Sequence, residues 1–315
     1  MTVSRVLNNK TQHVSAATRE LVLRKAKEVG YRPNRAAQAL VTGGKTHTIA
    51  LWVRRLASPY YSEIVDVLDT LLAADGFEAI IRGSGADRSV LSEWPVDGII
   101  ALDNAYDRPV RPSDYAGALP LFVGIGAYVD RDVDHVELDL DTPTHAATMH
   151  LVEQGCRRIA HISKAGQERS DSRCQGYLRA IYQSGMTPEI MFLPGESRAH
   201  VRDPLTQHIA RYGCPDGFIC RNDDVAVGVY RTLRSLGLRI PQDACIVGCD
   251  GTLDTEFLDT PISTIKTPVN ALCQTAWTML RCRLDNPEQP VQAKLIGCEL
   301  VVRRSSMRQP AQPAP

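Results

Sequence analysis

From His47 onward, short apolar runs alternate with amphipathic stretches, and this alternation limits the possible folds more than any other feature of the sequence. Continuous apolar strands between helices are typical of parallel, doubly wound α/β sheets, whose strands are buried on both faces. The strands are predicted at 48–53, 79–82, 98–102, 121–125, 136–138, 158–162, 190–193, 217–220 and 245–248. The helices are predicted at 60–75, 142–154, 172–185, 198–212, 223–236 and 269–284.

About nine strands are too many for one compact sheet of this kind, so two doubly wound subdomains are expected. Ligands of open α/β sheets bind beyond the carboxyl ends of the strands. Two such sheets facing each other would therefore form a ligand-binding cleft.

The first 46 residues differ from the rest in charge and in pattern. They contain nine Lys/Arg and two acidic residues, a net charge of +7, which leaves −7 on the remainder of a chain that is neutral overall. Helices are predicted over 2–8 and 16–29, with Ser15 as the N-cap of the second and Gly30 after its end. Residues 34–40 could form a short third helix, which would need a partner to order it. A small basic head on an acidic body indicates a nucleic-acid partner.

Several classes of protein are excluded by what the sequence lacks. No run approaches the roughly 18 apolar residues of a membrane span, and the first 20 residues contain no secretory signal pattern. The nine cysteines show no C-x-x-C pair and no zinc-ligand spacing, so they are predicted to be reduced thiols that mostly pack in the interior. A cytoplasmic protein without metal or cofactor is expected.

Three segments of the sequence bear on whether the protein is an enzyme. Residues 247–255 resemble the first motif of the haloacid dehalogenase-type phosphatases, but Gly248 stands where the nucleophilic aspartate would be. The segments 83–85 and 124–126 follow strands but lack the third glycine of a dinucleotide-binding loop. No Ser/His/Asp or Cys/His set stands out, so we predict that the protein is not an enzyme.

The basic head and several strings of the body together resemble one family. TVSRVLN at 2–8 and VSAATRELVLRKAKEVGYRPNRAAQAL at 14–40 are similar to the DNA-binding head of the LacI/GalR (lactose repressor-like) regulators. In the body, the resemblance continues at 150–160, where Cys156 replaces the family's usual histidine, and at Arg173 with Gly176 and Tyr177. It also covers 215–223, 246–250 and 261–265, which is nearly the whole chain.

The resemblance implies a fold and a function. It implies a truncated helix-turn-helix head with a hinge helix over 1–46, a periplasmic-binding-protein-like core over 47–306 and a disordered tail over 307–315. The core would comprise an N-subdomain, 47–143 plus 269–297, and a C-subdomain, 144–268 plus 298–306. It further implies a DNA-binding transcriptional regulator, more often a repressor than an activator, that acts in the cytoplasm at the nucleoid. A sugar, sugar acid or sugar phosphate in the cleft would control operator affinity.

The resemblance also assigns residues by position. On the recognition helix, base and phosphate contacts fall on Thr2, Ser4, Arg5 and Asn8. Ser15 and Thr18 would bind phosphate at a helix N-terminus. On the hinge helix, DNA contacts fall on Asn34, Ala37 and Leu40, with Leu40 as a minor-groove wedge. The effector-binding positions are Arg54, Tyr60, Tyr61, Arg173, Ser197, Asn222 and Asp250.

Two departures and one alternative complete these expectations. Two arginines, Arg54 and Arg173, favour an acidic or phosphorylated effector, unless Arg54 pairs with an acid. Family heads begin about 17 residues earlier, so Met1 falls inside the recognition helix, and we expect a partly disordered head with little specific operator binding.

A near-palindromic operator implies a homodimer, and 307–315 has no leucine heptad for a tetramer. The alternative is a solute-binding or receptor-type sensor with the same core and no specific DNA binding.

Overall fold

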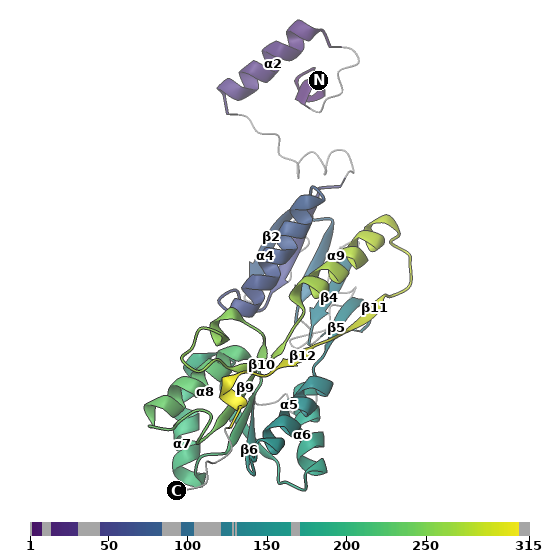
Figure 1. The fold of residues 1–315 in the computed structure, drawn as a ribbon. Coiled ribbons are helices and arrows are strands. Elements are labelled where there is room, and N and C mark those ends of the chain that lie inside the picture. The colour runs from purple at the N-terminus through teal and green to yellow at the C-terminus, as the bar shows by residue number, and fades with distance from the viewer. Residues whose placement is uncertain are drawn as a thin grey trace.

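The computed structural model describes residues 2–7, 14–30, 45–83, 96–103, 121–127, 129, 131–164 and 171–308. Within these ranges the core consists of two six-stranded sheets (Figure 1). The predicted class, two doubly wound α/β subdomains with a small helical head, is confirmed.

The first sheet is parallel throughout. Its strands, in spatial order, are β11 (Ala293–Gly297), β5 (Asp134–Asp139), β4 (Leu121–Gly126), β3 (Gly98–Leu102), β1 (Thr48–Val53) and β2 (Glu78–Gly83). Helices α4 (Pro59–Ala74) and α9 (Val269–Asp285) pack against each other beside this sheet. Their apolar residues, including Leu68 and Leu280, join the buried core of β1, β3 and β4. We call this half the N-subdomain.

The second sheet is parallel except at one edge, where β12 runs antiparallel to β10. Its strands, in spatial order, are β12 (Glu299–Val301), β10 (Ser263–Lys266), β9 (Cys245–Asp250), β8 (Gly217–Cys220), β6 (Ile159–Lys164) and β7 (Glu189–Leu193). Helices α5 (Asp141–Glu153) and α6 (Ser172–Gln183) lie on one face, and α7 (Arg202–Tyr212) and α8 (Asp223–Ser235) on the other (Figure 1). We call this half the C-subdomain.

The chain passes between the two sheets three times, after β5, after β10 and between β11 and β12. Because the connections are short, the two sheets can pivot about them while each stays folded.

Most predicted elements are found within one or two residues of their predicted bounds. The helix predicted over 198–212 is interrupted at Val201, which separates the 3₁₀ turn η4 (Arg198–His200) from α7. Three strands, β10, β11 and β12, were not predicted. Residues 307 and 308, predicted to begin a disordered tail, are in place, since the Arg308 N–H donates to Gln154 Oε1 at 2.9 Å.

In the head, α1 (Thr2–Leu7) and α2 (Ala16–Glu28) contact each other. Ser15 caps α2 as predicted, because its Oγ accepts from the Thr18 N–H at 3.2 Å. Val6 is 1% exposed, whereas Leu21 and Val29 are 47% and 75% exposed. The short helix predicted over 34–40 lies outside the described residues. Across the described ranges, we find no helix with both the length and the apolar character needed to cross a membrane.

Candidate functional site

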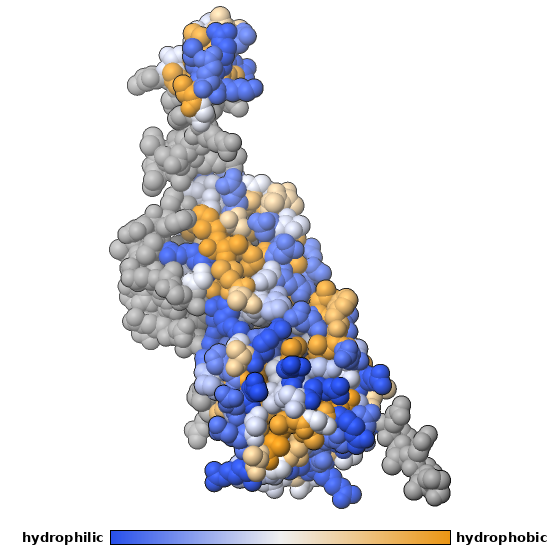
Figure 2. Space-filling model, turned by 90° about the vertical axis from the view of Figure 1, so that its left-hand side faces the viewer, coloured by the Kyte–Doolittle hydropathy of each residue, from blue (hydrophilic) through white to orange (hydrophobic). Residues whose placement is uncertain are grey.

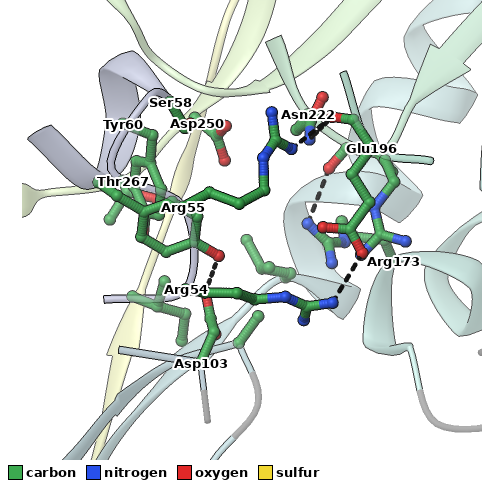
Figure 3. A pocket seen from close by; sticks show the side chains of 15 residues that line it. Arg54, Arg55, Ser58, Tyr60, Asp103, Arg173, Glu196, Asn222, Asp250 and Thr267 are labelled. Atoms are coloured by element: carbon green, nitrogen blue, oxygen red, sulfur yellow. Dashed lines mark hydrogen bonds and ion pairs between the residues drawn. The ribbon is translucent and has the colours of Figure 1, made fainter. Parts of the chain in front are cut away.

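A polar cavity lies where the carboxyl ends of the strands of both sheets face each other (Figure 3). The side chains leave little free space in it, about 30 Å³ for the centre of a water molecule, because residues of the two subdomains meet across it. Every wall residue but Leu138 follows or ends a strand or begins a helix, as expected for a site at the switch points of two α/β sheets. The wall residues are Arg54, Arg55, Ser58, Tyr60, Tyr61, Asp103, Ala127, Leu138, Leu140, Arg173, Glu196, Arg221, Asn222, Asp250 and Thr267.

Two tyrosines from the first turn of α4 form the aromatic part of the wall. The ring centroids of Tyr60 and Tyr61 lie 5.2 Å apart in an edge-to-face arrangement. The Tyr61 hydroxyl donates to Asp103 Oδ2 at 2.8 Å. Burial, and then the charge of Asp103, raises the pKa of both phenols well above the usual value, so both remain neutral donors.

Asp103 is held at the end of β3 in a backbone conformation that non-glycine residues seldom adopt, with φ of +51°. Its N–H donates to the carbonyl of Ile125, at 2.9 Å. A Cβ on Gly126 would lie 2.3 Å from Asp103 Oδ1, so the end of β4 must be glycine to leave room for this carboxylate. Strain of this kind is concentrated at functional sites.

Arg173, in the first turn of α6, is fixed by a carboxylate behind it. Its Nε and Nη2 donate to Asp171 at 2.8 and 3.2 Å, and its Nη1 donates to the carbonyl of Arg221 at 2.7 Å. Asp171 is fully buried and Arg173 is 5% exposed. Burial alone would raise the pKa of Asp171, but Arg173 holds that pKa well below its usual range. The site therefore contains a pre-oriented and already neutralised guanidinium.

Asp223 explains why the string around Gly248 is not a phosphatase motif. Its Oδ2 accepts from the backbone N–H groups of Gly251 and Thr252, at 2.8 and 2.7 Å, and its Oδ1 accepts from Thr264 Oγ1 at 2.7 Å. A Cβ at position 248 would lie 2.1 Å from Asp223 Oδ1, so glycine is needed there for packing. The same network holds the loop after β9 that presents Asp250 to the cavity. Burial, and then the charge of Asp223, raises the pKa of Asp250 well above the usual value.

Ion pairs cross the cavity between the two subdomains. Arg54 Nη2 lies 3.0 Å from Glu196 Oε1, and Arg55 donates to the Glu196 carbonyl at 2.8 Å and to Asp224 Oδ2 at 3.2 Å. Glu196 also lies 3.3 Å from Lys164 Nζ and 3.6 Å from Arg221 Nη2. Burial would raise the pKa of Glu196, but Arg221, Arg54 and Lys164 hold it below the usual value.

Six of the residues that the resemblance assigned to an effector line this one cavity, namely Arg54, Tyr60, Tyr61, Arg173, Asn222 and Asp250. The seventh, Ser197, does not line it. Its Oγ lies 2.8 Å from Nδ1 of His200, and its neighbour Glu196 faces the cavity instead. The structure therefore places Glu196, and not Ser197, in the cavity wall.

Five polar wall residues were not predicted from the sequence, namely Arg55, Asp103, Glu196, Arg221 and Thr267. Each lies one or a few residues beyond the carboxyl end of a strand, which is the signal that could have found them. Asp103 in particular directly follows the buried strand β3.

His161 lies on β6 behind the site and is fully buried. Its ring stacks on Tyr177, with centroids 5.3 Å apart, and its Nδ1 lies 3.1 Å from the carbonyl of Ile219. Burial lowers the pKa of His161 to about 4. In the unfolded chain the pKa is near 6.5, so between these values only the unfolded state takes up the proton.

We therefore expect His161 to make stability depend on pH. Its contribution is fully present above about pH 6.5 and is lost as the pH falls towards 4, by about 3 kcal/mol in total. The measurement is the free energy of unfolding in urea across this range. His161→Leu should flatten the difference, whereas parallel profiles for the wild type and the variant would contradict the assignment.

In the head, Thr2, Arg5 and Ser15 are exposed and Thr18 is half-buried. Ser15 Oγ lies 2.8 Å from Thr18 Oγ1, so both hydroxyls stand at the N-terminus of α2. The side chain of Ser4, and residues Asn8, Asn34, Ala37 and Leu40, lie outside what the structure describes.

Comparison with known proteins agrees with both parts of the chain. Residues 1–34 match the model of "Bacterial regulatory proteins, lacI family", and residues 148–306 match that of "Periplasmic binding protein-like domain". The transcriptional regulator CelR of Thermobifida fusca is 32% identical over 96% of this chain and 94% of its own length.

Solved structures agree as well. A CelR–cellobiose complex is 27% identical with a TM-score of 0.72, covering 96% of this chain and 94% of its own. The lac repressor dimer bound to operator is 24% identical with a TM-score of 0.76, covering 98% and 95%, and shows the shared fold. The chain is not an enzyme; it belongs to the LacI family of bacterial regulatory proteins.

Proposed function

We propose that this regulator binds an uncharged sugar in the cavity between its subdomains, and that the sugar controls the affinity of the head for an operator. The observation that carries the proposal is that arginines reaching into the cavity already have carboxylate partners. Arg54 pairs with Glu196, Arg55 with Asp224 and Arg173 with Asp171.

Because these arginines are paired with carboxylates, they do not favour an acidic or phosphorylated effector. Arg54 and Arg173 would have favoured one if they had been unpaired. A phosphate would have to displace an existing carboxylate partner or bring a third charge into a partly buried cluster, and an uncompensated buried charge is costly. A neutral hydroxyl meets no such cost, since Arg173 can donate to it while remaining paired.

The other wall residues suit a sugar. Asp103, Glu196 and Asp250 offer carboxyl oxygens, and Asn222 offers an amide, to a ring of hydroxyl groups. Tyr60 and Tyr61 provide an aromatic surface for the apolar face of a pyranose or furanose. The cellobiose complex of the relative CelR supports the same ligand class.

The test is a calorimetric panel on the 315-residue chain. Ribose, glucose and cellobiose are compared with glucose 6-phosphate and gluconate, and any binder is then added to a footprinting assay on the DNA upstream of the gene. We expect a neutral sugar to bind. Protection of a near-palindromic site by this chain is expected to be weak, and the sugar should change it. Binding by the phosphate or the acid alone would overturn the ligand class. Sugar binding without any DNA footprint, even at micromolar protein, would favour the sensor alternative.

For DNA we propose the contacts that the resemblance assigns, with Thr2, Ser4, Arg5 and Asn8 reading the major groove and Ser15 and Thr18 at phosphate. The positive charge of α2, which carries Arg19, Arg24, Lys25 and Lys27, supports a polyanionic partner. Such a regulator would act in the cytoplasm at the nucleoid.

We further propose that the protein acts as a homodimer through the side of the N-subdomain that carries α4 and β2. Figure 2 views this side and shows apolar side chains gathered in a band across it. Ile81 on β2 is 45% exposed, Leu56 is 48% exposed, and Val67 and Leu71 on α4 are only partly buried. Exposed apolar patches of this kind commonly mark protein–protein contacts, and the solved lac repressor is a dimer on operator.

The substitution Ile81→Asp is expected to weaken self-association about tenfold or more, because it places a charge in the apolar contact. Light scattering over a concentration series measures the effect. Phe192→Asp is the matched control, since Phe192 is 44% exposed on β7, the outer strand of the other sheet. If Ile81→Asp and Phe192→Asp dimerise equally well, the dimer contact does not include Ile81.

A further inference from the structure

We propose that Cys156 and Cys245, at the opposite end of the C-subdomain from the cavity, form a peroxide-sensitive dithiol that closes to a disulfide. The proposal does not depend on the identity of the effector. It begins from a departure noted in the sequence, since Cys156 stands where the family resemblance predicts histidine.

The two cysteines meet around one backbone carbonyl. The Cys156 thiol donates to the carbonyl of Asp216 at 3.3 Å, and the backbone N–H of Cys245 donates to the same oxygen at 2.9 Å. Gly217 pairs with Cys245 across neighbouring strands, and a Cβ on Gly217 would lie 3.3 Å from Cys156 Sγ, so the two cysteine side chains lie close together. A disulfide forms if a local closure brings the two sulfur atoms to about 2.05 Å.

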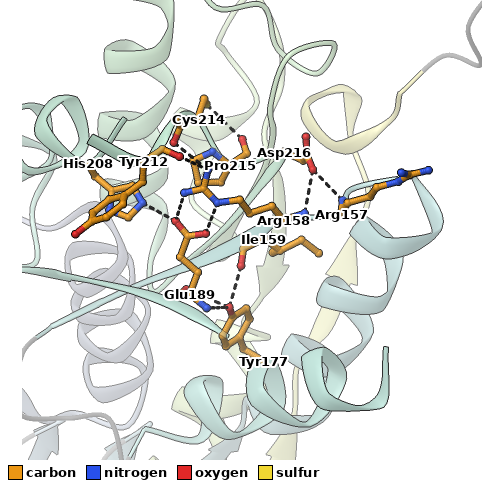
Figure 4. Close-up of polar contacts among 11 residues, drawn as sticks. Arg157, Arg158, Ile159, Tyr177, Glu189, His208, Tyr212, Cys214, Pro215 and Asp216 are labelled. Atoms are coloured by element: carbon orange, nitrogen blue, oxygen red, sulfur yellow. Dashed lines mark hydrogen bonds and ion pairs between the residues drawn. The ribbon is translucent and has the colours of Figure 1, made fainter. Parts of the chain in front are cut away.

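The turn that carries Cys156 is fixed in place. The Asp216 carboxylate accepts from the backbone N–H groups of Arg157 and Arg158, each at 2.9 Å (Figure 4). Asp216 thus anchors this turn through its side chain and the Cys156 thiol through its carbonyl. The position of Cys156 relative to Cys245 is therefore set by these hydrogen bonds.

A cation lies against the pair. Arg308 donates to the carbonyl of Asp216 at 3.0 Å and to that of Pro241 at 3.3 Å, and the Cys245 thiol donates to the same Pro241 carbonyl at 3.7 Å. The hydrogen bond from Cys156, and then Arg308, lowers the pKa of Cys245, while the pKa of Cys156 is raised. A cysteine whose pKa is lowered, next to one whose pKa is raised, is the arrangement in which the first reacts with a peroxide and the second resolves the product.

The chemistry balances with hydrogen peroxide as the oxidant. The Cys245 thiolate attacks one peroxide oxygen, the O–O bond breaks, and sulfenic acid and hydroxide form. The Cys156 thiol then attacks that sulfur, its proton leaves with the departing hydroxyl as water, and the S–S bond forms. Two thiols lose two electrons in total, and one peroxide becomes two waters. Cys156 and Cys245 are 2% and 0% exposed, so only a small oxidant can reach them.

The test uses the full chain carrying Cys282→Ser, because Cys282 is the exposed cysteine among the nine. The protein is titrated with hydrogen peroxide, alkylated in denaturant and digested without reductant for mass spectrometry. We expect a linked peptide pair containing residues 156 and 245, the loss of two free thiols, and full recovery with dithiothreitol. Cys156→Ser and Cys245→Ser should each abolish the link. Cys273→Ser, which removes another fully buried thiol, should leave it unchanged.

Two results would overturn the proposal. One is that both cysteines remain alkylatable after the half-buried Cys214 and Cys298 have been oxidised. The other is that any disulfide formed joins a different pair. Circular dichroism of each variant shows whether it is folded, and the wild-type pairing decides the proposal even if a serine variant fails to fold.

Arg308→Met tests the positioning role of the cation, because methionine keeps an apolar cover over the pair but removes the charge. We expect disulfide formation at neutral pH to slow about tenfold, with the pH of half-maximal rate moving upward. An unchanged pH profile would mean that Arg308 has a structural role only.

Discussion

Replacing Arg173 by alanine is expected to abolish measurable sugar binding and also to lower the free energy of unfolding by about 3–5 kcal/mol. The stability loss is expected because Asp171 is fully buried and accepts two side-chain hydrogen bonds from Arg173. Without the guanidinium, a carboxylate is left in the interior without its main counter-charge. Urea denaturation measures the stability change, and calorimetry measures the binding change.

A double variant separates the two roles. Arg173→Gln combined with Asp171→Asn removes both charges together and keeps an amide that can cap α6, so most of the stability should return while binding stays lost. Arg158→Ala is a control in the same subdomain, because Arg158 pairs with Glu189 away from the cavity (Figure 4). It should cost stability and leave sugar affinity unchanged. Wild-type affinity in the double variant would show that Arg173 does not contact the ligand.

Gly176→Ala is expected to lower the free energy of unfolding by about 3 kcal/mol, because helices α5 and α6 touch at this point through their backbones. An added Cβ would lie 2.2 Å from the carbonyl oxygen of Asp141 and 3.0 Å from the backbone nitrogen of His145. Neither atom can move without shifting the N-terminal turn of α5. Thermal and urea unfolding followed by circular dichroism measure the loss.

Gly83→Ala is the control for this substitution. Gly83 ends β2 with an ordinary φ, and a Cβ there would meet nothing within 4 Å. Its stability should be unchanged or slightly higher, since alanine restricts the unfolded chain. If Gly176→Ala costs less than about 1 kcal/mol, the close approach of the two helices is not rigid.

Burial explains part of how far the sequence predicted the fold, since the buried four-residue strand β10 was also not predicted. Strands β1, β3 and β8 were predicted with the bounds observed, because their residues are almost all buried and appear as continuous apolar runs. Strand β11 is mostly exposed and β12 has three residues, so neither has a pattern that separates it from a loop. Both are outer strands whose pairing is set by the sheet beside them, which a local pattern does not contain.

The cavity shows the same limit. Tyr61, Arg173 and Asp250 could be placed because each belongs to a string that the family resemblance covers. The partners that determine their chemistry could not be placed. Asp103 is 42 residues from Tyr61, and Glu196 is 142 residues from Arg54. The first pairing is set by the adjacent strands β1 and β3 of one sheet and the second by the meeting of two sheets. The second pairing is one reason why we propose an uncharged effector.

The ion pairs from Arg54 and Arg55 across the cavity bear on the concentration at which the regulator responds. These ion pairs join the two subdomains across the cavity before any sugar binds, and we call this joined arrangement the closed form. A fraction of the unliganded molecules is therefore expected to have the closed form already. A sugar that selects this form has an apparent dissociation constant equal to its intrinsic one divided by that fraction. Asp224, which holds Arg55 without lining the cavity, is thus a position where evolution could adjust the sensitivity threshold of a gene without altering which sugar is recognised.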